Sequence, residues 1–455
     1  MAGHGQGGGG APPERGQWGS RLGFILAAAG SAVGLGNIWG FPFAAAENGG
    51  GLFVLAYLVF VAVIGLPVMI AEVMIGRRAQ RAPVGAYGRL SHDRVMWKLV
   101  GWMGVAAGFL ILSFYSVIAG WTLDYTLLSL RGAFEGLDAD AIGALFGERT
   151  EASGRVVLLH AIFMALTIAI VIGGVKGGLE RSVRILMPTL FVLIIGLVVY
   201  GMTLDGFGEG VRFLFVPEPG AFDGEAALAS LGQAFFSLSL GMGALITYGS
   251  YLRQKDDIVA ASATISVLDT TIAISAGLIL FPIAFTFAVP MGEGGAGFIF
   301  AVLPLAFTDM PAGDIVSVIF FALLLFAALT SAISLLEVVT STVIDQLGWT
   351  RRKATLVVAS AIFAVGLPSA VGYQLPFGEM SFLDGLYFLT SNIFLPLGGL
   401  FISIFAGWIL TRSATSEEFT MGTRLGGLYP GWLFLVRFVV PVAISIVFLS
   451  SIGVI

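Results

Sequence analysis

The sequence predicts an all-α integral membrane protein with about eleven transmembrane helices, built as a 5+5 inverted repeat with discontinuous helices 1 and 6. Three observations predict this fold class. Of the 455 residues, 57% are hydrophobic and 11% are charged, whereas a soluble domain carries roughly 25% charged residues. The mean hydropathy is +0.96. The apolar residues also fall into spans of membrane-crossing length, and two of these spans are interrupted at matching places.

The apolar spans set the number of helices. A transmembrane helix needs about 20 predominantly apolar residues. About eleven segments qualify, at roughly 21–43, 50–76, 97–130, 153–174, 178–203, 226–252, 259–288, 312–347, 353–372, 380–411 and 429–452. Because eleven is odd, the two termini are expected on opposite sides of the membrane.

The distribution of Lys and Arg predicts the orientation. The N-terminal tail and alternate loops hold most of the basic residues, whereas the opposite loops hold Arg131, Arg149, Arg155 and Arg212 and are otherwise acidic. Positive residues accumulate on the cytoplasmic side of membrane proteins. We therefore expect a multi-pass protein of the cell's inner (cytoplasmic) membrane, with its N-terminus inside and its C-terminus outside. Residues 1–20 are Gly-rich, without the apolar core of a cleavable signal peptide, and predict a cytoplasmic tail.

Two spans carry a G-x-G pattern near their middle. The first contains AAAGSAVGLGNIWGFP (Ala27–Pro42), and the sixth contains QAFFSLSLGMGALITYGS (Gln233–Ser250). The two spans are five segments apart, and an odd offset inverts the topology of the second copy. Inverted repeats with discontinuous helices show this pattern. We expect residues 21–203 and 226–411 to form the two repeats and residues 429–452 to add an eleventh helix.

A helix break inside a membrane indicates a binding site. Unsatisfied backbone groups cost several kcal/mol in hydrocarbon, so a break persists only where it is buried in protein or lines a polar cavity. A break around Gly30–Pro42 supplies free N–H groups for a carboxylate and free carbonyls for a cation. The alternative is that the glycines allow close helix packing. One such pattern would favour packing, but two at symmetric positions favour a binding site.

The strings RLGFILAAAGSAVGLGNIWGFPFAAAENGGG (Arg21–Gly51) and QAFFSLSLGMGALITYGSYLR (Gln233–Arg253) resemble the neurotransmitter:sodium symporter family. The resemblance runs over nearly the whole chain and looks most like the bacterial amino-acid branch. It implies a sodium-coupled secondary active importer of amino acids that works by alternating access. Na⁺, a small-molecule amino acid and the lipid bilayer are the implied partners.

The resemblance implies two sodium sites made of hard oxygen ligands. The first would use the Ala32 carbonyl and the side chains of Asn37, Ser237 and Asp269, with the substrate carboxylate as a further ligand. The second would use the carbonyls of Gly30, Val33 and Ala327 and the hydroxyls of Thr330 and Ser331. For the two hydroxyls the alternative is hydrogen bonding within their own helix.

Asp269 predicts that transport needs no chloride. It lies in a hydrophobic span, where an ionisable residue is costly and indicates function. Many bacterial relatives carry an amide at this position and an acid one turn later, where this chain has Ala273, and animal relatives use chloride. We expect Asp269 to supply the fixed negative charge. Pairing with a basic residue is the alternative, but no Lys or Arg is near in sequence.

The resemblance places the substrate between helices one, three, six and eight. The backbone at Leu35 and Gly36 and the Tyr115 hydroxyl would bind the carboxylate, and carbonyls near Phe236 and Ser239 would accept from the ammonium. A neutral, hydrophobic or aromatic amino acid is expected. The full set of implied substrate-binding residues is Ser31, Ala32, Leu35, Gly36, Ile111, Tyr115, Phe236, Ser237, Ser239, Met242, Ser331 and Leu335.

The resemblance also implies two gates. At the inner gate Arg15 would pair with Asp345, beside Trp18 and Tyr251; the alternative is that Arg15 is only one of the cytoplasmic positive charges. A Gly-x₉-Pro pattern at 178–188 would let the inner end of the fifth helix unwind, and the alternative is that it only marks the start of that helix.

The outer gate departs from the family, which has Arg where this chain has Gly40, although the acidic partner is retained as Asp384. Tyr115 and Phe236 are then expected to close the outer side.

The sequence excludes several other classes of protein. No Walker motif, catalytic triad or metal cluster is present, so no enzyme and no nucleic-acid partner is expected. The chain has no cysteine. Two alternatives remain open: an importer of a cationic or betaine-like amine, because Gly40 leaves Asp384 without its expected partner, and a receptor that binds amino acids without transporting them. Glu337 leaves proton counter-transport open, and the oligomeric state is not determined.

Overall fold

The computed structural model describes residues 16–218, 222–289, 298–372, 374–375 and 380–454. Within these residues nine helices are long and apolar enough to cross a membrane, and a tenth span is the bent pair Arg21–Ala32 and Gly36–Glu47. The one remaining span of the eleven, the sixth along the chain, consists of two short helices, Gly224–Ser237 and Ala244–Gly249. The prediction of about eleven transmembrane helices is therefore confirmed.

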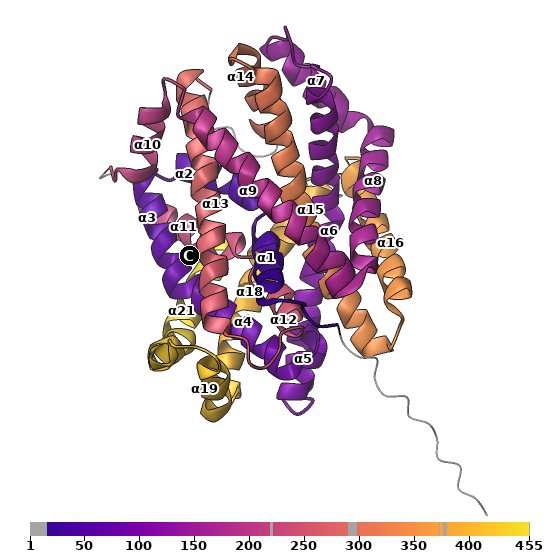
Figure 1. Ribbon diagram of the computed structural model, residues 1–455, viewed down its shortest axis with the longest axis vertical. Helices are drawn as coiled ribbons and strands as arrows, with labels where there is room; N and C mark the ends of the chain where they lie inside the picture. Colours follow the sequence, from indigo (N-terminus) through magenta and orange to yellow (C-terminus); the bar gives the residue numbers. More distant parts are fainter. Residues whose placement is uncertain (1–15, 219–221, 290–297, 373, 376–379, 455) are drawn as a thin grey trace, which may run out of the picture.

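The spans follow the predicted order along the chain, and several are composed of two helices joined by a π-helical segment (Figure 1). Their helices are α1 (Arg21–Ala32), α2 (Phe41–Glu47), α3 (Gly51–Phe60), α4 (Leu66–Ala79), α6 (Val95–Ser129), α8 (Ser153–Ile172), α9 (Arg181–Gly201), α11 (Gly224–Ser237), α12 (Ala244–Gly249), α13 (Ile258–Thr286), α15 (Gly313–Leu347), α16 (Arg351–Ala370), α17 (Phe382–Phe388), α18 (Leu395–Ile404), α20 (Tyr429–Phe434) and α21 (Val440–Ser451).

Five shorter helices occupy the connections between spans, and hydropathy did not predict them. These helices are α5 (Pro83–Leu90), α7 (Ala139–Glu151), α10 (Phe207–Phe215), α14 (Leu303–Asp309) and α19 (Arg412–Thr420). In Figure 1, α5 and α19 lie at the bottom of the bundle, and α7, α10 and α14 lie toward its top. All five are too short to cross a membrane, so a search for spans passes over them.

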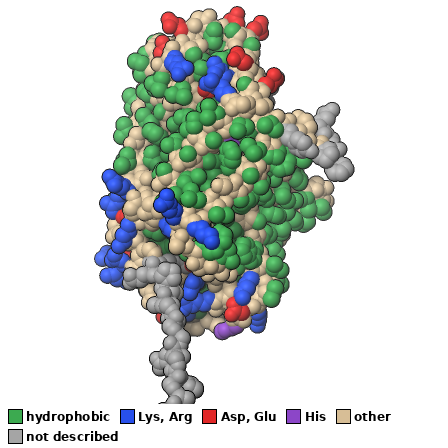
Figure 2. Space-filling model, turned by 90° about the vertical axis from the view of Figure 1, so that its right-hand side faces the viewer, with side chains coloured by type: hydrophobic (Ala, Val, Ile, Leu, Met, Phe, Trp, Pro, Cys, Tyr) green, Lys and Arg blue, Asp and Glu red, His purple; other side chains and the backbone are tan. Residues whose placement is uncertain are grey.

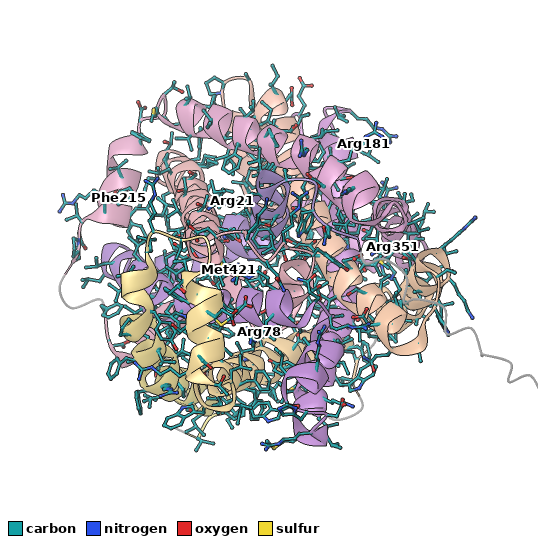
Figure 3. The ribbon with its side chains drawn as sticks, turned by 60° about the horizontal axis from the view of Figure 1, so that its bottom comes forward. Arg21, Arg78, Arg181, Phe215, Arg351 and Met421 are labelled. Atoms are coloured by element: carbon teal, nitrogen blue, oxygen red, sulfur yellow. The ribbon has the colours of Figure 1, made fainter. Side chains whose placement is uncertain are left out.

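The two ends of the bundle differ in charge. We call the end with α5 and α19 the basic end, and the end with α7, α10 and α14 the acidic end. Figure 2 shows a broad band of hydrophobic side chains, with most of the visible Asp and Glu above it and most of the visible Lys and Arg below. Figure 3 brings the basic end forward, where Arg21, Arg78, Arg181 and Arg351 come from four different spans.

The short helix α12 is held in the centre of the bundle by close packing against α4. A Cβ atom at Gly76 of α4 would lie 1.9 Å from the backbone oxygen of Ile246 in α12. Small residues allow such backbone approach between helices in a membrane. The second and sixth spans therefore meet without side chains between them at this point.

The helix α19 is tied to α4 by buried charges. Arg77 is 0% exposed, and its Nε donates to Glu418 Oε2 at 2.7 Å. Arg78 contacts Glu417 and Glu418, both at 3.2 Å. Both acids of α19 are thus already paired with arginines of α4.

Candidate functional site

The breaks in the first and sixth spans lie side by side at the middle of the bundle. α1 ends at Ala32 and the chain resumes as a π-helical segment at Gly36, bent by 55° from α1. The first break is therefore narrower than the predicted region Gly30–Pro42. α11 ends at Ser237, and α12 begins at Ala244.

The backbone groups of the two breaks are bonded by side chains of the sixth and second spans. Ser239 donates through Oγ to the Ser31 carbonyl at 3.0 Å, and Gln233 donates through Nε2 to the Gly36 carbonyl at 3.1 Å. Glu72 of α4 accepts from the Gly241 N–H at 2.7 Å. A break in hydrocarbon needs such partners. These contacts fix the sixth span against the first.

A cavity of about 60 Å³ lies between the breaks and is bounded by α6 and α15. Such a volume holds several waters at roughly 10–15 Å³ each. All twelve residues predicted to bind substrate line it, together with Gly34, Asn37, Ser334 and Leu395. The predicted residues are thus brought together in one place.

The side chains predicted for the first sodium site form one buried cluster. Asn37 donates through Nδ2 to Ser237 Oγ at 2.9 Å and to Asp269 Oδ1 at 2.7 Å. Ser237 donates to Asp269 Oδ2 at 2.6 Å. Tyr57 of α3 adds a hydroxyl 3.2 Å from Ser237 Oγ. All four side chains are at most 1% exposed, and Ala32 lies at the adjacent cavity.

The oxygens predicted for the second sodium site converge on Ser331 of α15. Its hydroxyl lies 3.1 Å from the Val33 carbonyl and 3.5 Å from the Gly30 carbonyl. Thr330 donates to the Ala327 carbonyl at 3.0 Å. This bond lies within its own helix, as the alternative interpretation of the hydroxyl expected. Ser331 therefore bonds across to the first span, whereas Thr330 bonds within α15.

One polar group of the cavity has no partner. The Tyr115 hydroxyl is buried and forms no hydrogen bond within the described residues. A Cβ atom at Gly34 would lie 3.3 Å from this hydroxyl, so the hydroxyl lies against the first break. An unpaired buried hydroxyl costs free energy unless a ligand or water satisfies it. The side chains of Ile111, Met242 and Leu335, which also line the cavity, are apolar.

The basic end of the site is closed by aromatic side chains. Trp18 is 3% exposed, and its Nε1 donates to the Tyr248 carbonyl at 2.9 Å. The rings of Trp18 and Tyr251 are 6.1 Å apart. Tyr251 donates to Glu337 at 2.6 Å, and Glu337 forms a salt bridge with Arg351 at 2.6 Å.

Of the predicted pair of Arg15 and Asp345, the structure describes only Asp345. Asp345 accepts from the Ala82 N–H at 2.7 Å and lies 3.9 Å from Arg81. Arg15 lies outside the described residues.

The acidic end opens onto a second, larger cavity of about 600 Å³. It is lined by Gly40, Gln233, Phe236 and Tyr387, among others. Gln233 lies where a side chain at position 40 would point, since a Cβ atom at Gly40 would be 3.7 Å from Gln233 Oε1. Phe236 and Leu395 lie between this cavity and the smaller one, because both residues line both cavities.

Asp384 lies at the start of α17. It is exposed and accepts from the Ser381 hydroxyl at 2.6 Å, while its N–H donates to the same hydroxyl. The contacts described for Asp384 are therefore local to the helix N-terminus.

Several residues at the site were not identified from the sequence. Ser334 donates to the Ser331 carbonyl and accepts from Ser31 at 2.8 Å, and its spacing of three residues from Ser331 was an available signal. Tyr57 and Leu395 reach the site from the second and tenth spans, and no sequence pattern marks them.

Glu180 was also missed. It precedes α9 and accepts from the Gly19 N–H at 2.6 Å, from the Ser20 hydroxyl at 3.0 Å and from Arg184 at 2.6 Å. It therefore ties the segment before α1 to the start of the fifth span, next to Gly178.

Comparison with known proteins gives concordant matches over nearly the whole chain. Residues 15–136 and 144–454 match the model of the sodium:neurotransmitter symporter family. An uncharacterized sodium-dependent transporter of Bacillus subtilis is 40% identical over 96% of this chain and 98% of its own length. An uncharacterized sodium-dependent transporter of Haemophilus influenzae is 34% identical over the same shares.

A crystal structure of MhsT in complex with L-phenylalanine has a similar fold. It is 45% identical, covers 96% of this chain and 100% of its own, and superposes with a TM-score of 0.87. The match confirms the predicted fold class, an all-α membrane protein with discontinuous helices 1 and 6.

The geometry of the second break makes Gly241 sensitive to substitution. Its φ of +89° disfavours any side chain, and a Cβ atom would lie 2.3 Å from the Leu395 carbonyl oxygen. We expect Gly241→Ala to destabilise the protein by about 2 kcal/mol or more, seen as a lower melting temperature in detergent. Gly232→Ala in α11 is the control, since nothing lies within 4 Å of its Cβ position. Equal melting temperatures for the two variants would contradict this account.

Proposed function

The chain belongs to the sodium:neurotransmitter symporter family, and we propose that it is a sodium-coupled importer of neutral, hydrophobic or aromatic amino acids. One observation carries the proposal: the cavity between the two breaks is lined both by apolar side chains and by polar residues of the two oxygen clusters. An amino acid has the same division between its side chain and its charged backbone groups.

The charged groups of an amino acid match the polar lining of the cavity. The unpaired Tyr115 hydroxyl and the N–H groups of the first break would receive the carboxylate, because free N–H groups at a helix end favour an anion. Carbonyls near Phe236 and Ser239 would receive the ammonium. Such hydrogen bonds to charged groups contribute about 1.5–3 kcal/mol each.

The residues lining the smaller cavity favour a neutral side chain. Ile111, Phe236, Met242 and Leu335 surround the space, and its lining contains no Asp, Glu, Lys or Arg. Met adapts its shape to different partners. The L-phenylalanine bound to MhsT, which is 45% identical to this chain, supports the same substrate class. A cationic or betaine-like amine is the second candidate, favoured by the exposed Asp384, which precedes Tyr387 of the larger cavity by three residues in α17.

Na⁺ would bind at the two oxygen clusters. The first cluster offers the Asn37 and Ser237 side chains and the Asp269 carboxylate, and the second offers the Val33 and Gly30 carbonyls beside Ser331. Hard oxygens of this kind suit a small hard cation. The first cluster touches the substrate cavity through Asn37 and Ser237, so the substrate carboxylate and Na⁺ would stabilise each other's binding.

Asp269 would make chloride unnecessary. Its carboxylate is 0% exposed, and it forms no salt bridge within the described part of the chain. A buried charge without a partner is strongly unfavourable. Sodium would supply the missing positive charge directly, with no second anion.

Transport would proceed by alternating access between the two ends. The basic end would face the cytoplasm, with the N-terminus inside and the C-terminus outside. The bundle formed by the first, second, sixth and seventh spans would move against the remaining spans around the fixed site. A potential of about 100 mV contributes about 2.3 kcal/mol per charge. Two Na⁺ per zwitterion would supply ~4.6 kcal/mol, or about three decades of accumulation.

Opening toward the basic end would require release of Glu180. The Val175–Glu180 segment before α9 is already π-helical, and Pro188 interrupts the hydrogen bonding of α9. Unwinding there would move Glu180 away from Gly19 and Ser20. Trp18 would then lose its anchor over α12, which would open the inner path.

The substrate class is tested by uptake into proteoliposomes with an inward gradient of Na⁺ or K⁺. We expect accumulation of phenylalanine, leucine and related amino acids with Na⁺ only, and weak competition by lysine, arginine and glycine betaine. Tyr115→Phe removes one hydroxyl and should weaken apparent affinity by roughly tenfold to a hundredfold. Strong competition by lysine or betaine would favour the second candidate. Sodium-dependent binding without counterflow would indicate a receptor.

The role of Asp269 is tested by replacing chloride with gluconate. Uptake by the wild-type protein should not change, because the carboxylate supplies the negative charge. Na⁺-dependent uptake by Asp269→Asn in gluconate should be at least about tenfold lower than that of the wild type. This decrease corresponds to a loss of more than ~1.4 kcal/mol of ion-binding free energy. Glu209→Gln, an exposed acid of α10, is the control. A strict chloride requirement in the wild type would refute the assignment.

The role of Glu180 is tested with a cysteine reporter, since the chain has no cysteine of its own. Tyr248→Cys places a thiol beneath Trp18, where labelling by a soluble maleimide reports opening of the basic end. We expect Glu180→Gln to increase the labelling rate several-fold by weakening the tether to Gly19 and Ser20. Asp93→Asn, which removes an exposed pair with Lys98 at the same end, should leave the rate unchanged. Equal rates in both variants would exclude the tether.

A further inference from the structure

Arg437 is a charged residue in the lipid-facing eleventh span. It lies in the π-helical segment Leu435–Val439, between α20 and α21. Only 22% of the apolar window of this span is buried by the rest of the bundle. Around Arg437, Trp408, Phe434 and Phe438 are 55%, 58% and 49% exposed. The residue is therefore surrounded by side chains that face hydrocarbon.

The contacts of Arg437 use one of its hydrogen-bond donors. Nε donates to the Gly407 carbonyl at 2.5 Å, and Cζ lies 5.4 Å from the centroid of the Trp408 ring. Trp408 in turn donates through Nε1 to the Arg437 carbonyl at 3.2 Å. A guanidinium has five N–H donors in a planar fork, so its outer edge remains available for a ligand.

The described residues supply no counter-charge for this guanidinium. No carboxylate among them forms a salt bridge with Arg437. The nearby acids of α19, Glu417 and Glu418, are paired with Arg77 and Arg78. Arginine keeps its charge in proteins, and an unpaired charge in the hydrocarbon region is costly. No group in the described part of the chain supplies the compensating negative charge, which an anionic lipid would provide.

The contact with Gly407 places the Arg437 side chain near the basic end of the tenth span, although Arg437 itself lies roughly 12 Å along the eleventh span from Tyr429. Its partner Gly407 belongs to the π-helical segment Phe405–Ile409, which ends the tenth span at the basic end. At about 1.5 Å per residue, Gly407 lies roughly 3 Å inside the end of that helix. Trp residues are typical of this interface, and long basic side chains extend toward it. The fork of Arg437 is thus within reach of phosphates.

We propose that Arg437 and Trp408 form a binding site for the phosphate of an anionic phospholipid in the leaflet at the basic end. The free edge of the guanidinium binds two phosphate oxygens, a geometry that arginine favours. The exposed rings of Phe434 and Phe438, which lie 5.6 Å apart, receive the upper part of an acyl chain. The lipid joins the tenth and eleventh spans on their outer face.

The proposal is tested by native mass spectrometry of the detergent-purified protein after incubation with equal amounts of phosphatidylglycerol and phosphatidylcholine. The wild type should retain phosphatidylglycerol preferentially. Arg437→Gln should reduce its apparent affinity about fivefold, the factor expected for one basic side chain at an anionic surface. Arg424→Gln, an exposed arginine in the loop at the same end, is the matched control and should retain the lipid.

Two further measurements distinguish loss of lipid binding from loss of folding, and a lipid site from a site for a free anion. Melting temperatures show whether Arg437→Gln is folded. Independently of any variant, the wild type in nanodiscs should melt at a higher temperature as phosphatidylglycerol replaces phosphatidylcholine, and inorganic phosphate alone should have no effect. Equal retention by Arg437→Gln and Arg424→Gln, or no stabilisation of the wild type by phosphatidylglycerol, would overturn the proposal. Stabilisation by inorganic phosphate alone would assign the site to a free anion and not to a lipid.

Discussion

The structure depends on the requirement that every backbone polar group in hydrocarbon has a partner. Two spans depart from regular helix geometry, and side chains of the sixth and second spans bond the backbone groups that the breaks expose. Ser239 and Gln233 bond carbonyls of the first break, and Glu72 bonds an N–H of the second. Neither break could exist alone in lipid. The site is therefore a consequence of how the two irregular segments and the second span pack together, and the remaining helices enclose it.

The same requirement governs the charged side chains, and it distinguishes Asp269 from Glu337 and Glu418. Arg77 is paired with Glu418 and Glu337 with Arg351, each pair fixing two segments at the basic end. Asp269 instead accepts from two neutral side chains, which lower the cost of its burial without neutralising it. A paired acid holds the structure together, whereas an acid bonded to neutral groups retains its attraction for a cation. This difference supports sodium at Asp269 and not at Glu337.

Hydropathy predicted the spans well because a segment crosses a membrane when its residues are predominantly apolar. The predicted fold class was confirmed. The breaks were also predicted, since glycines and polar residues stand out in apolar sequence. The short helices α5 and α19 were missed because their stability comes from packing and ion pairs such as Arg77–Glu418. Tyr57, Leu395 and Glu180 were missed for a related reason. Each joins the site through a contact between distant segments, which a single sequence does not contain.

The two ends of the bundle are closed by different physical means, and this asymmetry follows from Gly40. At the basic end, Trp18 lies over α12 and the Glu337–Arg351 pair holds Tyr251 in place. At the acidic end, an uncharged hydrogen bond from Gln233 and the ring of Phe236 separate the small cavity from the large one. Neutral contacts can be broken without exposing an unpaired charge, so separation at this end costs less than at the other. A site that opens more readily on its acidic side is suited to receive Na⁺ and substrate there first, before the ion pairs at the basic end give way.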